Sequence, residues 1–432
     1  MRVVRSVRTA VRFATSRITQ PHFERSTHLS VRVFEAGRLG TAIGGDLSRD
    51  GVAQLVGTAR ALARVSVEEP KFPGFPDGGG SAVRPTPYSR ATARLTPEAV
   101  TRIAERLLSS ALDAAPGARV AGLVNVDATE LSVLNTSGLD RGTAQSSGQA
   151  SVLVERPEGE SPVSGWADGA HWDAARLKPE DLGREAAGRV ARTPPLSAKP
   201  GAYRVVLAST AVADLLAFLA ILGFSGHGEE EGWSCLLRRR GRRVAPPSVT
   251  LWDDPRSPLS LPLAIDFEGV PTRRLALLDH GIVGPAVTDL VTAGRLGRGL
   301  TGHGPPPEAP FGDWGPVPGN LVMKAGDASF DELVKATGNG LLVTRFHYVR
   351  TVQPGRGVIT GMTRDGTYRI RRGEIAEPVR NLRFTESVLT ALAGVAAIGK
   401  AAERHAPDAV SSIATCPALA LRRFRFTSAT LF

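Results

Sequence analysis

Hydrophobic and polar residues alternate along residues 10–47 in the manner of β-strands, and a turn signal interrupts the alternation. The sequence LSVRVFEAGRLGTAIG spans residues 29–44 and has the turn residues EAGR at its centre. This pattern predicts a β-hairpin. Directly after it, apolar residues recur at the spacing of a helix, which predicts a helix over residues 49–65.

The middle of the chain alternates between loop, helix and strand patterns. Residues 68–89 are dense in proline and glycine, which predicts a long surface loop. A helix is expected over residues 96–112, where Thr96 can cap the first turn and Pro97 fits inside it. The remaining expectations are two or three strands within 118–155, turns at 135–138 and 146–148, and a helix over 178–192.

A change in composition suggests where the chain divides. The sequence RTPPLSAKPG at residues 192–201 offers three prolines and a glycine between periodic segments, so we predict two domains, residues 1–196 and residues 197–432. The elements expected in the second domain are a strand at 203–207, an apolar helix at 209–223, a strand–turn–strand around 240–241, a helix near 284–296, strands through 320–381 and a helix at 385–404. This order of elements predicts the α+β fold class.

Length and composition agree with a globular protein in a reducing compartment. The 432 residues are 42% hydrophobic with a mean hydropathy of −0.06. The longest apolar run, residues 211–224, contains Asp214 and is shorter than the roughly 20 residues of a membrane-spanning helix, so we expect no membrane segment. Two cysteines cannot build a disulfide framework, which favours a cytoplasmic location.

The net charge of +11 would usually suggest nucleic acid as a partner. However, only six of the 53 basic residues are lysine, which indicates arginine-rich composition rather than a binding surface. The run RRRGRR at 238–243 could contact phosphates, but Gly241 favours a hairpin turn with solvated arginines, and no aromatic residues interleave with the run. Nucleic acid is therefore an unlikely partner.

Motifs of known chemistry are scarce in this sequence. It has no His-Glu-x-x-His, no Gly-x-Ser-x-Gly and no Walker loop, and its eight histidines are scattered. Asp266 and Glu268 stand at i and i+2, a spacing that places two carboxylates on one face of a strand. Such a pair suits a metal, an arginine pair or a peptide amine, and a salt bridge with Arg273 or Arg274 is an equal alternative.

Several segments resemble one known family. They are DFEGVPTRRLALLDHGIV, AVTDLVTAGRLG, LTGHG, GNLVMKAGDASFDELVKATGNGLLVTRFHYV and GTYRIRRGEIAEPVRNLRFTESVLTALAGVAAIG, together with VRFATSRITQ and VRVFEAGRLGTAIGGDLS near the N-terminus. In this order they resemble the TldD/PmbA family of two-subunit metallopeptidases, once described as gyrase modulators. Only residues 1–10 precede the first expected strand, where the resemblance implies an additional helix and strand, so we expect a trimmed region or a misassigned start.

The resemblance also implies that this chain lacks a zinc site. In the catalytic TldD branch, a helix carries His-Glu-x-x-x-His, whose imidazoles bind zinc and whose glutamate is the general base. The matching helix here, VVLASTAVADLLAFLAILGFSG, places Ala217, Phe218 and Leu222 at those positions. The chain therefore resembles the non-catalytic TldE/PmbA-type subunit, with no metal of its own and zinc in a TldD-like partner.

The function implied by this resemblance is that of one half of a heterodimeric zinc peptidase. Such a subunit would shape the cleft through which an unstructured peptide reaches the partner's zinc. Its fold would combine an N-terminal α/β domain with a β-rich C-terminal domain that has an antiparallel, barrel-like sheet. Four residues of the matched motifs are candidates for lining that cleft: His280, His303, Arg345 and His347. Two alternatives remain, namely a stand-alone enzyme that uses Asp266, Glu268 and loop histidines, and a module that binds gyrase or nucleic acid.

Overall fold

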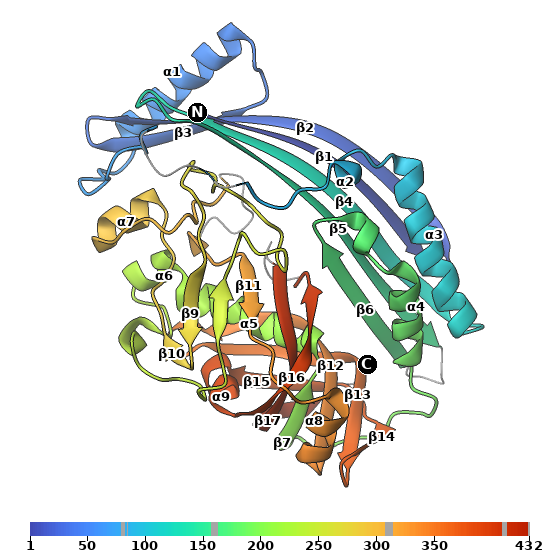
Figure 1. Cartoon of the computed structure of the whole chain (residues 1–432). Helices are drawn as coiled ribbons and strands as arrows, with labels where there is room; N and C mark the ends of the chain where they lie inside the picture. Colours follow the sequence, from blue (N-terminus) through green and yellow to red (C-terminus); the bar gives the residue numbers. More distant parts are fainter. Residues whose placement is uncertain (79–82, 84, 157–162, 307–313, 408–412, 431–432) are drawn as a thin grey trace.

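Two β-sheets dominate the computed structural model of the chain (Figure 1). The structure describes residues 1–78, 83, 85–156, 163–306, 314–407 and 413–430. The first sheet is built from residues 2–171 and the second from residues 201–429. Residue 196, near which a domain boundary is predicted, lies between β6 and β7, and the division into two domains stays a prediction.

The first sheet has six antiparallel strands in the order β3-β2-β1-β4-β5-β6. Its strands are β1 (Arg2–Ala14), β2 (Arg17–Glu35), β3 (Arg38–Gly44), β4 (Arg119–Leu134), β5 (Asp140–Arg156) and β6 (Val163–His171). The helices that accompany it are α1 (Arg49–Val65), α2 (Arg90–Ala93), α3 (Pro97–Ala114) and α4 (Pro179–Gly188). The predicted hairpin at 29–44 is confirmed as the end of β2 and all of β3.

One face of this sheet is covered by α2, α3 and α4, while the other face curves over the second sheet (Figure 1). Helix α3 starts as the sequence predicts, because the Thr96 hydroxyl accepts a hydrogen bond from the Ala99 amide and Pro97 needs no amide partner in the first turn. Its buried stripe includes Val100, Ala104 and Leu107, and it packs with Val11 and Phe13 of β1 in one apolar core.

The second sheet has eleven strands, five of which close into a ring. Its strands are β7 (Gly201–Leu207), β8 (Leu251–Asp253), β9 (Leu275–Asp279), β10 (Ile282–Val283), β11 (Asn320–Met323), β12 (Gly340–Gln353), β13 (Val358–Arg371), β14 (Glu374–Pro378), β15 (Leu382–Ser387), β16 (Val395–His405) and β17 (Ile413–Ala429). The ring runs β17-β15-β13-β12-β7 and back to β17. The prediction of an antiparallel sheet is only partly correct. Within the ring β12 pairs with β7 in parallel, and outside it β11 pairs with β17 in parallel.

Five helices belong to the second part of the chain. They are α5 (Ser209–Phe224), α6 (Gly226–Glu230), α7 (Leu290–Leu296), α8 (Phe330–Thr337) and α9 (Val388–Ala393). Helix α5 is buried along its whole length except at Asp214, which is half-buried, and it packs in the large core with the strands of the ring. A helix that is apolar all round is what a fully buried position requires.

The predicted helix over 385–404 is wrong. Strand β15 ends at Ser387, the short helix α9 follows, and β16 then pairs antiparallel with β17 from Val395 to His405. The alanines of this segment favour a helix locally, but glycines at 394 and 399 interrupt it and pairing with the buried β17 stabilises a strand instead.

The predicted strand–turn–strand around residues 240–241 is also wrong. Residues 237–239 form a 3₁₀ helix, and Arg240 turns inward rather than into solvent. Its guanidinium pairs with Glu229 at 2.8 Å and donates hydrogen bonds to the carbonyls of Gly223 and Gly284. An arginine that finds a buried carboxylate cannot be recognised from the basic run alone.

Smaller differences concern turns and helix ends. Ser146 and Ser147 lie inside β5 rather than in the predicted turn, whereas the turn predicted at 135–138 does connect β4 to β5. The helix expected near 284–296 begins only at Leu290, after a capping box formed by Asp289 and Thr292. Among the described residues, no helix is both long and apolar enough to cross a membrane.

Candidate functional site

The three positions that match the zinc motif lie in the interior of α5. Ala217 and Leu222 are fully buried, and Phe218 is 5% exposed. None of these side chains carries a nitrogen, oxygen or sulfur atom that could bind a metal. The residues present at these positions do not fit zinc, and no hydrolytic step through a metal can be derived for them.

A cavity of about 580 Å³ lies where the chain segment around α4 meets the second sheet. Glu185 and Arg189 line it from the N-terminal side, and Tyr368 of β13 and Glu403 of β16 line it from the C-terminal side. Ser209, the first residue of α5, also lines this cavity. The cavity therefore adjoins the N-terminal end of α5.

A charge cluster joins the two sheets beside this cavity, with the side chains of His405 and Asp168 largely buried and that of Glu403 exposed. The His405 ring in β16 places Nδ1 2.9 Å from the Asp168 carboxylate in β6 and Nε2 3.7 Å from the Glu403 carboxylate. The Ser209 hydroxyl donates a hydrogen bond to Glu403. Burial alone would lower the pKa of His405, but the two carboxylates outweigh it and raise that pKa to about 10.

This electrostatic environment fixes the protonation state of the cluster. The nearby His405 ring lowers the pKa of Glu403 to about 2, and the raised pKa of His405 keeps its imidazole protonated at neutral pH, close to two carboxylates. An imidazole that is already protonated cannot accept a proton from water or from a nucleophile. The adjacent Cys416 thiol donates to the Ser209 carbonyl, and burial raises its pKa well above the ordinary value, so it is not a thiolate nucleophile.

Sequence reasoning did not find this cluster. The helix predicted over residues 385–404 includes Glu403 and ends one residue before His405, and side chains at i and i+2 of a helix face different directions. In the observed strand the same spacing places both side chains on one face. Asp168 is distant in sequence, and only the approach of β6 to β16 brings it to His405.

The predicted cleft residue Arg345 lies between the two sheets. Its guanidinium pairs with Asp365 at 2.7 Å and stacks over the Trp166 ring of β6, 3.7 Å from the ring centroid. Asp365 also accepts a hydrogen bond from Ser164, again across the two sheets. His347 lies two residues further along β12 and is half-buried.

The other two predicted cleft residues occupy different environments. His280 is exposed in the turn between β9 and β10, where it pairs with Asp279 at 2.8 Å. His303 is buried, and its ring bonds to Asp253 at 2.9 Å and to Thr301. Neither these two residues nor Arg345 and His347 belong to the lining of the 580 Å³ cavity.

Asp266 and Glu268 do not form the predicted same-face pair on a strand. They lie in a turn, where Asp266 accepts hydrogen bonds from the amides of Glu268, Val270 and Gly304. Glu268 pairs with Arg32 at 2.6 Å and accepts from the Leu290 amide, and neither Arg273 nor Arg274 is its partner.

These two carboxylates therefore have a structural role. Burial raises the pKa of both Asp266 and Glu268, and the hydrogen bonds that they accept oppose this rise. Each of their four oxygens already accepts a hydrogen bond from the protein. A metal or a substrate amine would have to displace these partners.

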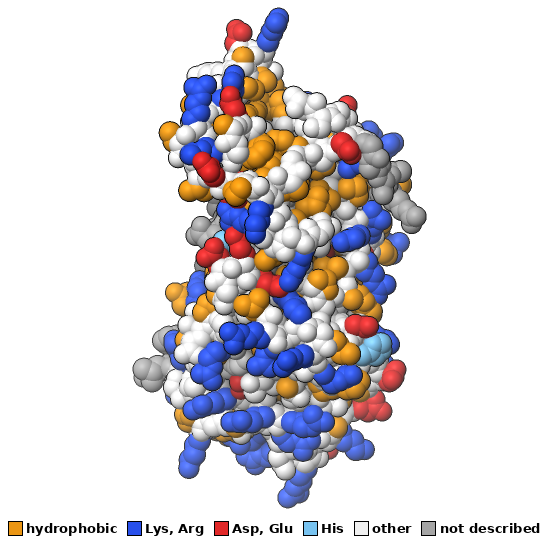
Figure 2. Space-filling view, turned by 90° about the vertical axis from the view of Figure 1, so that its left-hand side faces the viewer, with side chains coloured by type: hydrophobic (Ala, Val, Ile, Leu, Met, Phe, Trp, Pro, Cys, Tyr) orange, Lys and Arg blue, Asp and Glu red, His pale blue; other side chains and the backbone are white. Residues whose placement is uncertain are grey.

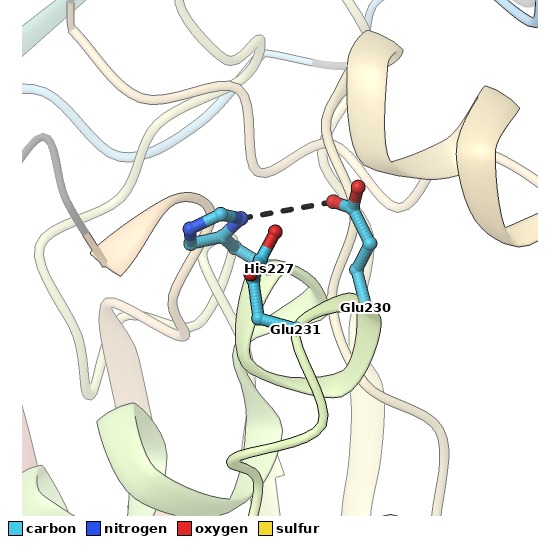
Figure 3. A group of neighbouring side chains, drawn as sticks. All are labelled: His227, Glu230 and Glu231. Atoms are coloured by element: carbon cyan, nitrogen blue, oxygen red, sulfur yellow. Dashed lines mark ion pairs between the residues drawn. The ribbon is translucent and has the colours of Figure 1, made fainter.

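One group of described side chains is arranged closely enough to bind a metal ion. The ligand atoms of His227, Glu230 and Glu231 lie within 4.8 Å of one another at the short helix α6, as Figure 3 shows. His227 Nδ1 lies 3.7 Å from Glu230, and Arg295 pairs with the other oxygen of Glu230 at 2.7 Å. The guanidinium neutralises part of the negative charge that a cation would need.

Family models match most of the chain. The model described as PmbA/TldA metallopeptidase C-terminal domain matches residues 200–428, and the model described as PmbA/TldA metallopeptidase domain 1 matches residues 1–63. The two matches include the strands of the second sheet and the first three strands of the first sheet. The chain belongs to the TldD/PmbA family, which confirms the resemblance found in the sequence.

Curated relatives match over part of their length. A metalloprotease of Methanothermobacter thermautotrophicus is 28% identical over 226 residues, which are 51% of this chain and 48% of that protein. A zinc metalloprotease TldD homolog of Saccharolobus solfataricus is 26% identical over 211 residues, 47% of this chain and 45% of that protein. The matches therefore span about half the length of these relatives.

Solved structures share the whole fold. TldE from Thermococcus kodakarensis superposes with a TM-score of 0.88 at 21% identity, covering 99% of this chain and 96% of that one. A putative modulator of a DNA gyrase from Thermotoga maritima superposes with a TM-score of 0.87 at 22% identity, covering 99% and 95%. These likenesses establish the two-sheet architecture.

Proposed function

We propose that this chain is the TldE/PmbA-type subunit of a heterodimeric zinc peptidase and that the zinc belongs to a TldD-like partner. The observation that carries the proposal is the interior of α5. Ala217, Phe218 and Leu222 pack into the apolar core at the positions where the catalytic branch carries its two histidines and its glutamate. A family fold that lacks metal-binding groups at these positions is suited to be a partner of the catalytic subunit.

The proposed substrate is an unstructured peptide, and the proposed role of this chain is to shape the cleft. The 580 Å³ cavity between α4 and the second sheet supports this role, because it offers charged groups from both parts of the chain beside the start of α5. An extended peptide can satisfy its backbone by pairing with a strand edge. The proposal includes a cytoplasmic location, which the two buried free thiols support.

The test is reconstitution. The chain is purified alone, and also with a family member that carries His-Glu-x-x-x-His, and hydrolysis of unfolded casein is measured. We expect no hydrolysis by this chain alone, and hydrolysis by the mixture that a zinc chelator abolishes. A stable one-to-one complex in size-exclusion chromatography is the second expected result, and failure of the two chains to associate would contradict the proposal.

Two other functions are tested by the same preparation. Chelator-resistant hydrolysis by this chain alone, lost in Glu268→Gln, would support a stand-alone enzyme, although the hydrogen bonds of Asp266 and Glu268 favour a structural role. The Thermotoga maritima neighbour is described as a putative modulator of a DNA gyrase. A corresponding role here requires DNA binding that weakens steeply with salt.

A further inference from the structure

A second pocket lies on the second part of the chain and shares no lining residue with the α4 cavity. It measures about 1010 Å³ and lies between the 3₁₀ helix at 237–239, the loop that follows it, the turn at 354–356 and helix α9. Four exposed arginines line it: Arg238, Arg239, Arg243 and Arg356. The first three belong to the basic run that the sequence singled out.

The charge of this pocket is unbalanced. Its described lining contains no aspartate or glutamate, and none of its four arginines forms an ion pair with a described carboxylate. Arg243 donates a hydrogen bond to the His280 carbonyl, which leaves its positive charge without a carboxylate partner. Four guanidiniums around one hollow, none of them neutralised by a described carboxylate, create a positive potential that favours an anionic ligand.

Figure 2 shows the wider setting of this charge. Lys and Arg side chains gather over the lower half of the face, where the second part of the chain lies, and few Asp or Glu side chains stand among them. The pocket is thus a concave feature on the more basic part of the molecule. An approaching anion would be attracted over a distance set by the Debye length, roughly 8–10 Å at physiological salt.

Between the arginines the pocket is apolar and carries hydroxyl groups. Leu237, Val244 and Leu389 supply apolar surface, and Ser387 and Thr390 supply hydroxyls. No aromatic side chain is part of the described lining, so there is no platform on which a base could stack. The lining therefore matches a ligand that alternates carboxylates with aliphatic groups.

We propose that this basic pocket binds an acidic peptide segment in which Asp or Glu side chains alternate with aliphatic ones. Carboxylates spaced along a chain can each meet a separate guanidinium, which forms charge-assisted, bidentate hydrogen bonds. A single small anion would occupy only a small part of 1010 Å³. The proposal does not depend on the peptidase function, because the pocket shares no lining residue with the α4 cavity.

The experiment measures fluorescence anisotropy of a short labelled peptide of Glu, Gly and Leu, titrated with the full chain. A peptide with Gln at every Glu position and a DNA oligonucleotide are the comparison ligands. The test variant is Arg239→Gln combined with Arg356→Gln. The charge-matched control is Arg17→Gln combined with Arg119→Gln, two exposed arginines of the first sheet that line none of the pockets described here.

We expect the acidic peptide to bind, the Gln peptide not to bind, and the test variant to bind about tenfold more weakly than the control variant. Equal affinities of the two variants, or absence of peptide binding, would overturn the proposal. Tighter binding of DNA than of the acidic peptide, lost in the test variant, would also overturn it and assign the pocket to nucleic acid. Thermal melting of both variants verifies that the substitutions at these exposed positions leave the fold intact.

Discussion

At the scale of single residues, a few buried charged side chains form ion pairs with residues that are distant in the sequence. His405 and Asp168 are separated by 237 positions in sequence, yet their side chains meet at 2.9 Å in a site where the imidazole is 5% exposed. Removing one member of such a pair leaves the other charge buried without compensation, which costs about 3–5 kcal/mol. Residue identity thus matters most where the two sheets approach each other.

We expect the pH dependence of the free energy of unfolding to reveal the contribution of the His405–Asp168 pair. His405 keeps its proton in the folded protein up to about pH 10, whereas in the unfolded chain it loses the proton near its ordinary value of 6.5. The stabilisation by the pair is therefore complete below pH 6.5 and is lost as the pH rises toward 10. We expect Asp168→Asn to lower the free energy of unfolding at pH 6 by about 3 kcal/mol and to flatten its decline with pH.

Chemical denaturation at a series of pH values measures this effect. Asp279→Asn is the matched control, because Asp279 pairs with the exposed His280 at the same kind of distance, 2.8 Å. An exposed pair contributes at most about 1 kcal/mol, so the control should retain the slope of the parent protein. The interpretation of the cluster is wrong if Asp168→Asn and Asp279→Asn give the same pH profile.

At the scale of elements, local patterns predicted those helices and strands whose partners lie nearby or whose amphipathic period is clear. The hairpin at 29–44 and helices α1 and α3 follow from alternation, capping residues and apolar stripes. The helix predicted over residues 385–404 is wrong, because the spacing of the alanines in this segment does not distinguish a helix from a strand paired with β17. The glycines at 394 and 399 are the features of the sequence that argue against a helix.

The packing of α1 on β3 depends on one glycine. A Cβ atom at Gly40 would lie 2.0 Å from the Ala59 carbonyl oxygen and 2.4 Å from the Ala63 amide nitrogen. Gly40→Ala should therefore displace α1 and lower the melting temperature. Gly57→Ala is the matched control, because its added methyl group meets nothing within 4 Å and alanine favours a helix by about 0.5–1 kcal/mol.

Thermal melting followed by circular dichroism compares the two alanine variants. Opposite signs are expected, with Gly57→Ala slightly more stable than the parent protein and Gly40→Ala less stable. If Gly40→Ala melts at the parent temperature, the close contact between β3 and α1 does not hold α1 in place.

At the scale of the whole molecule, polar contacts in addition to the His405–Asp168 pair join the two sheets. Arg345 pairs with Asp365 and stacks on Trp166, the Tyr368 hydroxyl donates to the Arg189 carbonyl, and Ser164 donates to Asp365. Of these residues, Tyr368 and Arg189 line the 580 Å³ cavity. The contacts give Arg345 a positioning role between the sheets, and its predicted role in lining a substrate cleft stays a prediction.

Arg345→Ala should loosen the two sheets relative to each other. It leaves the Asp365 carboxylate, which is 2% exposed, with the more distant Arg364 guanidinium at 3.8 Å as its described arginine partner, so a loss of about 3 kcal/mol is expected. Limited proteolysis of residues 189–200 should also become faster. Arg8→Ala is the control, because Arg8 pairs with Asp127 within the first sheet and is half exposed. Equal proteolysis rates for the two variants would contradict the role assigned to Arg345.

The sequence by itself determined the family, the α+β class and the apolar residues at positions 217, 218 and 222 of α5. These features depend on residue types and short spacings, which are visible without a partner segment. Only the tertiary structure decided that Asp266 and Glu268 bind backbone amides and Arg32, that His405 meets Asp168, and that the basic run surrounds a pocket. The reason is physical, since the pairing of a buried charge and the concavity of a surface depend on chain segments that sequence periodicity does not bring together.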